Sequence, residues 1–142
     1  MNIDKLIIYC DGGSRGNPGP AGLGVVIYDE DNNVIEEISE FLGVTTNNQA
    51  EYKGVLQAIK KAKELKAKEL IFYLDSELIV KQMSGEYRVK NKDLLPLYNE
   101  IRKYILEFKK VEFNHVRREY NKEADALANK AMDENSKTKR KK

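Results

Sequence analysis

The sequence of 142 residues has the length of one domain, long enough to bury a core but too short for two. Its 41% hydrophobic and 34% charged residues are typical of a soluble globular protein, and a net charge of only +2 excludes a basic footprint spread over the whole surface. The single cysteine, Cys10, excludes an internal disulfide, and neither a leader nor a membrane-spanning run is evident, so we expect a cytoplasmic protein.

The first third of the chain predicts an antiparallel meander of three strands, over residues 3–10, 21–28 and 34–42. The Gly- and Pro-rich segment 11–20 lies between the first two strands. A phosphate-binding loop is a weak interpretation of this segment, because no Gly-Lys-Ser/Thr follows and no helix begins there. We expect its glycines to allow a tight turn with positive φ.

The middle of the chain predicts a helix and then a buried strand. Thr46 and Gln49 have the spacing of a capping box, and the helix that follows is expected to run to about Leu65. Residues 70–74 are apolar without alternation, which is typical of a central strand covered on both faces.

The last part of the chain predicts three further helices and a fifth strand. Ser76 can cap a short helix, and residues 92–108 indicate a second one. Residues 111–115 alternate as a strand, so we interpret His115 as a packed residue and not as a metal ligand. Asn121 can cap the last helix. The order βββαβααβα predicts an α/β fold with one mixed five-stranded sheet flanked by helices.

Four acidic residues fall where these elements begin or end: Asp11, Glu51, Asp75 and Asp125. Two of them directly follow apolar strands, at the edge where open α/β sheets usually place ligands, and the other two are expected in the first turns of helices. Converging carboxylates repel one another unless cations neutralise them, and hard cations such as Mg²⁺ prefer oxygen ligands. Singly, each acid could merely cap or stabilise a helix start, so spacing alone leaves both interpretations open.

Four segments resemble the motifs of type 1 ribonucleases H, in the family's order: residues 9–22, 46–51, 74–76 and 121–128. The resemblance covers about residues 3–133 and implies a ribonuclease H domain over residues 1–134. It also implies the strand order 3-2-1-4-5 and sequence-independent endonuclease cleavage of the RNA strand of RNA–DNA hybrids.

The resemblance also assigns roles to individual residues. It implies that Asp11, Glu51, Asp75 and Asp125 hold two Mg²⁺ ions, with Mn²⁺ as an alternative, and that the products carry 5′-phosphate and 3′-hydroxyl ends. It implies contacts to the RNA strand from Ser14, Asn17, Asn47, Gln49 and Ser76, a contact to the opposite strand from Asn48, and a pocket for a DNA phosphate formed by Thr46 and Asn91.

The chain departs from the family pattern in two places. The segment before the last helix is short and lacks the histidine that many members carry, which leaves Arg118 and Glu119 as candidates to replace it. The family's basic handle with its tryptophans is also missing. Residues 135–142 are expected to form a basic, disordered tail, which either attracts phosphates or is a passive terminus.

We expect a monomer whose partner is an RNA–DNA hybrid and not a membrane. One rival interpretation is a hybrid-binding module without catalysis, although such a protein has no need of all four acids. A sugar-kinase or actin-like ATPase is excluded because it would need a second domain.

Overall fold

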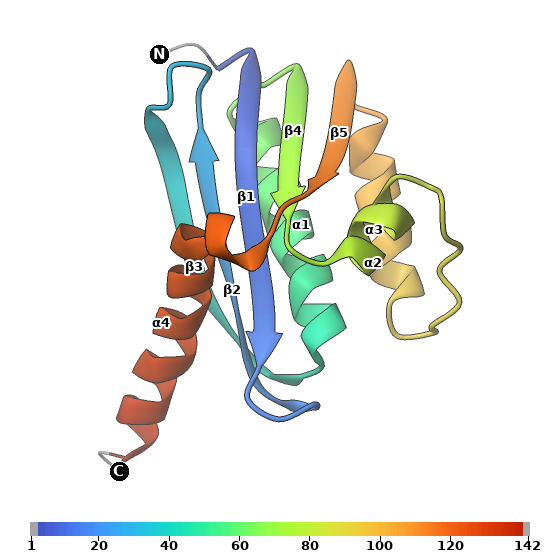
Figure 1. Cartoon of the computed structure of the whole chain (residues 1–142). Helices are drawn as coiled ribbons and strands as arrows, with labels where there is room; N and C mark the ends of the chain where they lie inside the picture. The colour runs from blue at the N-terminus through green and yellow to red at the C-terminus, as the bar shows by residue number, and fades with distance from the viewer. Residues whose placement is uncertain (1–2, 141–142) are drawn as a thin grey trace.

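A computed structural model of the chain describes the backbone of residues 3–140 and the side chains of residues 3–135. Its strands form one sheet in the order β3-β2-β1-β4-β5, so the predicted fold is confirmed (Figure 1). The elements are β1 (Lys5–Ser14), β2 (Gly19–Tyr28), β3 (Val34–Thr45), α1 (Asn47–Glu64), β4 (Glu69–Leu74), α2 (Glu77–Met83), α3 (Leu95–Ile105), β5 (Lys110–His115), the 3₁₀ turn η1 (Arg118–Tyr120) and α4 (Lys122–Arg140).

The sheet is mixed, and helices cover its two faces unequally. β1 pairs antiparallel with β2 and parallel with β4, and β4 pairs parallel with β5. The helices α1, α2 and α3 lie on one face, whereas α4 alone lies on the other, over β2 and β3 (Figure 1). The side chains of β2 are therefore almost all buried, while those of β1 and β4 alternate between buried and half-buried.

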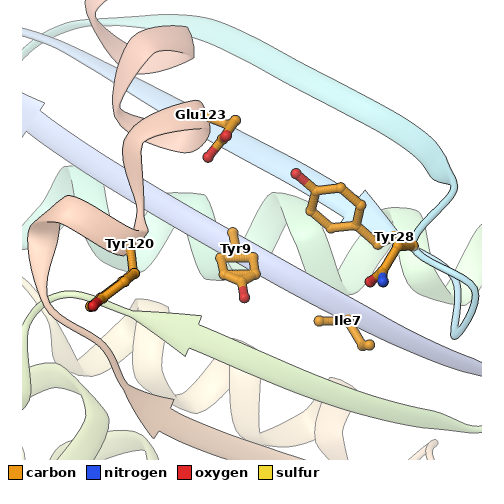
Figure 2. A pocket seen from close by; sticks show the side chains of 6 residues that line it. Ile7, Tyr9, Tyr28, Tyr120 and Glu123 are labelled. Atoms are coloured by element: carbon orange, nitrogen blue, oxygen red, sulfur yellow. The ribbon is translucent and has the colours of Figure 1, made fainter.

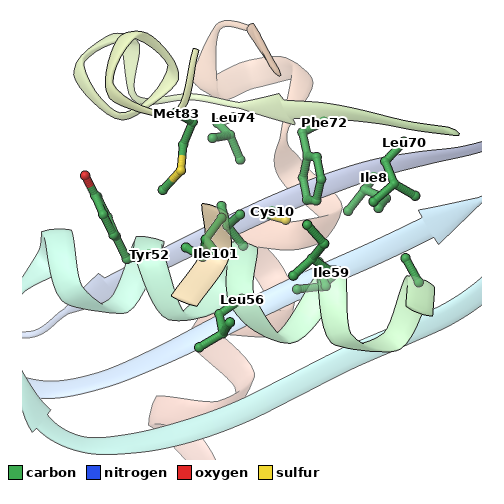
Figure 3. Close-up of a cluster of buried hydrophobic side chains, with 14 of the residues drawn as sticks. Ile8, Cys10, Tyr52, Leu56, Ile59, Leu70, Phe72, Leu74, Met83 and Ile101 are labelled. Carbon is green, nitrogen blue, oxygen red and sulfur yellow. The ribbon is translucent and has the colours of Figure 1, made fainter. Parts of the chain in front are cut away.

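The main hydrophobic core fills the space between the sheet and α1 to α3 (Figure 3). Alternate residues of β1 and β4 enter it, among them Ile8 and Phe72, because successive side chains of a strand point to opposite faces. The buried Tyr52 also reaches this core, where its hydroxyl donates a hydrogen bond of 2.6 Å to Oε1 of Gln82. The core thus fixes α1 and α2 against the strand ends that carry two of the acids.

Two predictions about strands are wrong. Only Leu70, Phe72 and Leu74 of β4 are buried, so this strand is covered fully on one face and not on both. α4 lies over β2 and β3 and leaves the second face of β4 partly open. His115 is exposed and not packed, because it is the last residue of the edge strand β5.

The glycines after the first strand differ from expectation. β1 continues to Ser14, so Gly12 is part of the strand and does not form a turn. The turn conformation belongs to Gly16, whose φ is 95°. A Cβ at Gly12 would collide with the Ala50 carbonyl of α1. Gly12 is therefore needed for the close approach of a helix to a strand.

The helix caps agree with the sequence in part. The hydroxyl of Thr46 accepts from the Gln49 amide N–H at 3.2 Å, and that of Ser76 accepts from the Ile79 amide N–H at 3.3 Å. The reciprocal half of the capping box is absent, since the Gln49 side chain pairs with the hydroxyl of Thr45.

The last helix passes the expected domain boundary. α4 runs from Lys122 to Arg140, and the expected boundary at residue 134 with a basic tail after it stays a prediction. The side chains from residue 136 onward and residues 141–142 lie outside the described part of the chain.

Candidate active site

Asp11 and Asp75 lie side by side where the parallel pairing of β1 with β4 ends, although β1 itself continues to Ser14. The parallel ladder between β1 and β4 closes with the pair Cys10 and Leu74, and each of the two acids comes directly after its member of that pair. Both carboxylates therefore lie at the carboxyl end of this parallel pair, as the sequence predicts, but the prediction that Asp11 follows its strand is wrong, because pairing with β2 carries β1 on to Ser14.

Two helices bring the other acids to the same edge. Gly12 lets α1 approach β1, and Gly24 lets α4 approach β2, since a Cβ there would collide with the Ala124 carbonyl. Asp125 lies in the first turn of α4 as expected. Glu51 is the fifth residue of α1, so its placement in the first turn is wrong.

All four acids line one hollow of about 420 Å³, the carboxylate hollow. Its other lining residues are Gly12, Gly13, Ser14, Arg15, Asn47, Asn48, Arg118, Ala128, Asn129 and Met132. The structure therefore brings together the four acids that the sequence singled out.

The electrostatics of this hollow are unfavourable for ionised carboxylates. Burial, a hydrogen bond with the Asp125 side chain and the charges of the neighbouring acids raise the pKa of Asp11 to about 9. Burial and the charge of Asp75 raise the pKa of Glu51 to about 8, which the Arg118 guanidinium partly offsets. Near neutral pH the cluster therefore keeps protons unless a cation supplies positive charge.

These residues fit a hard divalent cation by their chemistry, since the donors are carboxylate oxygens and their mutual repulsion would be relieved by positive charge. Within the described part of the chain, however, no group of three His, Cys, Asp or Glu side chains has the arrangement needed to hold a metal ion.

Two asparagines, which sequence analysis did not select for the site, contact its acids. Asn129, one turn after Asp125 on α4, donates to Oδ2 of Asp125 at 3.3 Å. Asn121 was predicted to cap α4, but its side-chain oxygen has no hydrogen-bond partner within the described residues, and its amide nitrogen donates to Oδ2 of Asp75 at 3.1 Å. The spacing of Asn129 from Asp125 could have indicated the first contact, whereas no local pattern indicates the second.

A second hollow, of about 190 Å³, gathers most of the expected substrate contacts. This amide hollow is lined by Asn17, Thr46, Asn48, Gln49, Asn91, Asp93 and Leu94. Asn48 also lines the carboxylate hollow, so the two hollows adjoin. Thr46 and Asn91, the expected phosphate-gripping pair, thus lie together although 45 positions separate them in the sequence.

Hydrogen bonds hold the other expected contacts in place. Oδ1 of Asn47 accepts from the backbone N–H of Ser14 at 2.7 Å and from its hydroxyl at 3.1 Å, and Oδ1 of Asn17 accepts from the Asn47 N–H at 3.1 Å. These bonds tie the start of α1 to the β1–β2 turn. Ser76 lines neither hollow and uses its hydroxyl as the cap of α2.

The two candidates to replace the missing histidine, Arg118 and Glu119, lie in different surroundings. Arg118 lines the carboxylate hollow, whereas Glu119 does not and pairs instead with Arg117 at 3.7 Å.

Cys10 is buried, and burial followed by the charges of Asp11 and Glu51 raises its thiol pKa well above the usual range. A thiol in this state is a poor nucleophile, in agreement with its interpretation as a small core residue.

A further hollow lies on the half-covered face of the sheet (Figure 2). Tyr9, Tyr28 and Tyr120 surround it with Ile7, Asn32 and Glu123. Tyr9 meets Tyr28 edge-on at 5.8 Å between ring centroids. This hollow contains none of the four clustered acids, so the chemistry of the site belongs to the carboxylate hollow.

A mixed sheet in this strand order, with acids converging on the end of its central strand, defines a ribonuclease H-like protein. Comparison with known proteins agrees. The profile of the family described as "Reverse transcriptase-like" matches residues 9–131. A ribonuclease H of Clostridium botulinum is 34% identical over 152 aligned positions, covering 93% of this chain and 98% of that protein. The chain belongs to the ribonuclease H family and resembles its type 1 members.

Other relatives are more similar or longer. A bifunctional protein of Mycobacterium tuberculosis is 45% identical over 91% of this chain, but the chain spans only 36% of that protein's length. The solved amino-terminal RNase H domain of a Mycobacterium tuberculosis protein superposes with a TM-score of 0.88 at 44% identity, covering 90% of this chain and 98% of that one. A compost-derived RNase H1, solved in complex with an RNA/DNA hybrid, gives 0.87 at 43% identity, covering 91% and 97%.

Within the described residues, no helix is both long and apolar enough to cross a membrane.

Proposed function

We propose that the chain is an endonuclease that hydrolyses the RNA strand of RNA–DNA hybrids, independent of sequence, and leaves 5′-phosphate and 3′-hydroxyl ends. The observation that carries this proposal is the convergence of Asp11, Glu51, Asp75 and Asp125 on one hollow at the carboxyl edge of the sheet. The relative that was solved with an RNA/DNA hybrid supports the substrate class.

The four carboxylates would hold two divalent cations, Mg²⁺ or Mn²⁺, which when bound activate water and stabilise the leaving oxygen in an in-line displacement. Asp11 interacts with all three of the other acids, since each of them raises its pKa. The chain needs no covalent nucleophile, and the buried Cys10 is unsuited to be one.

The chain's own residues would orient the hybrid. In this proposal the RNA strand passes the carboxylate hollow, where Ser14 and Asn47 lie, and is recognised through its 2′-hydroxyls. The opposite strand passes the amide hollow, where Thr46 and Asn91 would hold a phosphate and Asn48 contacts the strand between the two hollows. The remaining proposed contacts to RNA lie outside the carboxylate hollow: Asn17 and Gln49 line the adjoining amide hollow, so the RNA strand would also pass its near side, and Ser76 lines neither hollow.

Arg118 is the proposed replacement for the loop histidine. Its guanidinium lines the carboxylate hollow and already offsets part of the rise in the pKa of Glu51. The same positive charge can offset the negative charge of a phosphate there. Glu119 lies outside the hollow and is the weaker candidate. A monomer suffices for this proposal, because all four acids come from one chain.

A panel of end-labelled duplexes tests the proposal. In Mg²⁺ or Mn²⁺ the RNA strand of a hybrid should be cut at many positions, the DNA strand and a DNA duplex should stay intact, and a DNA duplex with one ribonucleotide should be a poor substrate. An RNA duplex in the same panel measures how far the DNA strand is required. Retention of the hybrid without cleavage in either metal would contradict the proposal and favour a binding module.

A further inference from the structure

Asn121 occupies a central place behind the carboxylate hollow. The residue lies between η1 and α4 and is fully buried, with 0% of its surface exposed. Its amide nitrogen donates to the Cys10 carbonyl at 2.8 Å and to Oδ2 of Asp75 at 3.1 Å. Cys10 directly precedes Asp11 on β1, so one amide group connects the two strand ends that carry acids.

The orientation of this amide is fixed by its partners. The amide nitrogen donates to a carbonyl oxygen and to a carboxylate oxygen, so the NH₂ side of the amide faces both. Oδ1 of Asn121 is buried and has no hydrogen-bond partner within the described residues. A buried acceptor without a partner is destabilising, and an apolar residue of similar size would avoid that penalty. Such a residue would, however, leave the Cys10 carbonyl and Oδ2 of Asp75 without this donor, so the asparagine is accounted for by the two bonds that its amide nitrogen makes.

The backbone of Asn121 extends the same connection. Its carbonyl accepts from the Asp125 N–H at 3.1 Å, and its own N–H donates to the Arg118 carbonyl at 2.9 Å. Asn121 thus contacts Asp75 directly and the immediate backbone of the segments that carry Asp11, Asp125 and Arg118. The amide is also neutral, so it can orient Asp75 without offsetting the negative charge that would attract a cation.

We propose that Asn121 is a positioning residue for divalent-cation binding. By holding Oδ2 of Asp75 at a fixed place relative to β1, it directs the other Asp75 oxygen and sets the spacing between Asp75, Asp11 and Asp125. This inference rests on the proposed function for its catalytic consequence, but cation binding can be measured separately. Residues that orient metal ligands typically contribute 10- to 100-fold in affinity or activity.

The test compares Asn121→Leu with a matched control, Asn33→Leu. Asn33 donates from its amide nitrogen to Oδ2 of the buried Asp29 at 3.0 Å, which is the same kind of bond but lies in the β2–β3 turn. Titration calorimetry with Mg²⁺ or Mn²⁺ alone should show affinity weakened about 10-fold or more by Asn121→Leu. Asn33→Leu should bind the cation as the wild type does.

Kinetics and unfolding separate positioning from a structural role. Asn121→Leu should lower kcat on a hybrid while leaving KM nearly unchanged, and higher Mg²⁺ should restore part of the rate. Each variant removes a donor from a buried acceptor, so the denaturant midpoint of both should fall, but only Asn121→Leu should also lose cation affinity and kcat. Wild-type cation affinity and kcat in folded Asn121→Leu would overturn the proposal.

If the leucine variant does not fold, Asn121→Ser carries the same test. A hydroxyl has one proton and can serve only one of the two acceptors, so cation affinity should again fall. Unchanged cation affinity in the serine variant would equally overturn the proposal. Weak cation binding by the variant together with an inactive wild type would refute the proposed function and leave the positioning role standing.

Discussion

Asp29, in the turn between β2 and β3, and Asp11, on β1, are both carboxylates largely withdrawn from solvent, yet their surroundings differ. Asp29 accepts hydrogen bonds from the backbone of Asp31 and Asn33, each at 2.9 Å, and from the Asn33 side chain at 3.0 Å. The Asn33 side-chain bond contributes most to a lowered pKa of Asp29. The charge is satisfied within the turn and needs nothing from outside.

Asp11 has the opposite environment. Burial contributes most to its raised pKa, and the neighbours that contribute next are Asp125, Asp75 and Glu51. Hydrogen-bond donors thus stabilise the charge of Asp29, whereas Asp11 is surrounded by other acids. Placing these acids close together therefore lowers the stability of the fold. Such unfavourable clusters of titratable groups are typical of functional sites.

The largest expected effect separates the two regions by activity. Asp11→Asn and Asp75→Asn should lower cleavage of a hybrid about 10³-fold or more, because each removes a charged ligand without changing shape. Asp29→Asn should stay within about threefold of wild type, as no part of that turn lines the carboxylate hollow. Hybrid binding, measured by gel shift, should persist in all three. If either Asp11→Asn or Asp75→Asn cleaved the hybrid near the wild-type rate, the assignment of four acids to the active site would be wrong.

The second prediction concerns the sign of stability changes without metal. At pH 8 Asp11→Asn should raise the free energy of unfolding by about 1–3 kcal/mol, because one pKa unit corresponds to about 1.4 kcal/mol and solvent in the hollow screens part of the effect. Asp29→Asn should lower it, since an acceptor of three hydrogen bonds is changed. Chemical denaturation in EDTA measures both, and destabilisation by Asp11→Asn would mean that the acids are not in conflict.

The third prediction extends the comparison to pH. Asp11 titrates at about 9 when folded and near 3.8 when unfolded, so between these values the folded state binds more protons. The metal-free free energy of unfolding should therefore fall as pH rises from about 5 to 9. Asp29, with a lowered pKa, contributes stability that is lost only as pH falls below its unfolded pKa, near 3.8.

Denaturation at several pH values would measure this dependence. The slope between pH 5 and 9 should flatten in Asp11→Asn and persist in Asp29→Asn. Equal slopes in wild type and Asp11→Asn would indicate that Asp11 is already ionised at neutral pH without a cation.

The smallest expected effect is a thermal shift. Mg²⁺ at about ten times its dissociation constant should stabilise the wild type by about 1.4 kcal/mol, which is a few degrees in Tm. Asp29→Asn should keep this shift and Asp11→Asn should lose most of it. A shift of equal size in both variants would place cation binding outside the carboxylate hollow.

Local patterns were sufficient to predict one mixed five-stranded sheet and to place four acids where elements begin or end, and the resemblance to type 1 ribonucleases H supplied the strand order and the roles of these acids. The sequence was insufficient where contacts join distant segments. Gly12 was expected in a turn and Gly24 in a strand, and only the packed helices show that both allow close approach. Asn121 has the sequence signature of a helix cap, but its partners lie 111 and 46 positions away. Such bonds leave no local pattern.

A carbon-13 NMR titration of side-chain carboxyl groups, with assignments from Asp11→Asn and Asp29→Asn, tests the central comparison most directly. Without metal, Asp11 should titrate above pH 7 and Asp29 below its usual range. With saturating Mg²⁺, Asp11 should move below pH 7, because a bound cation favours the ionised form, while Asp29 should stay where it is. Titration of Asp11 near its ordinary value in the absence of metal, with no response to Mg²⁺, would contradict the account.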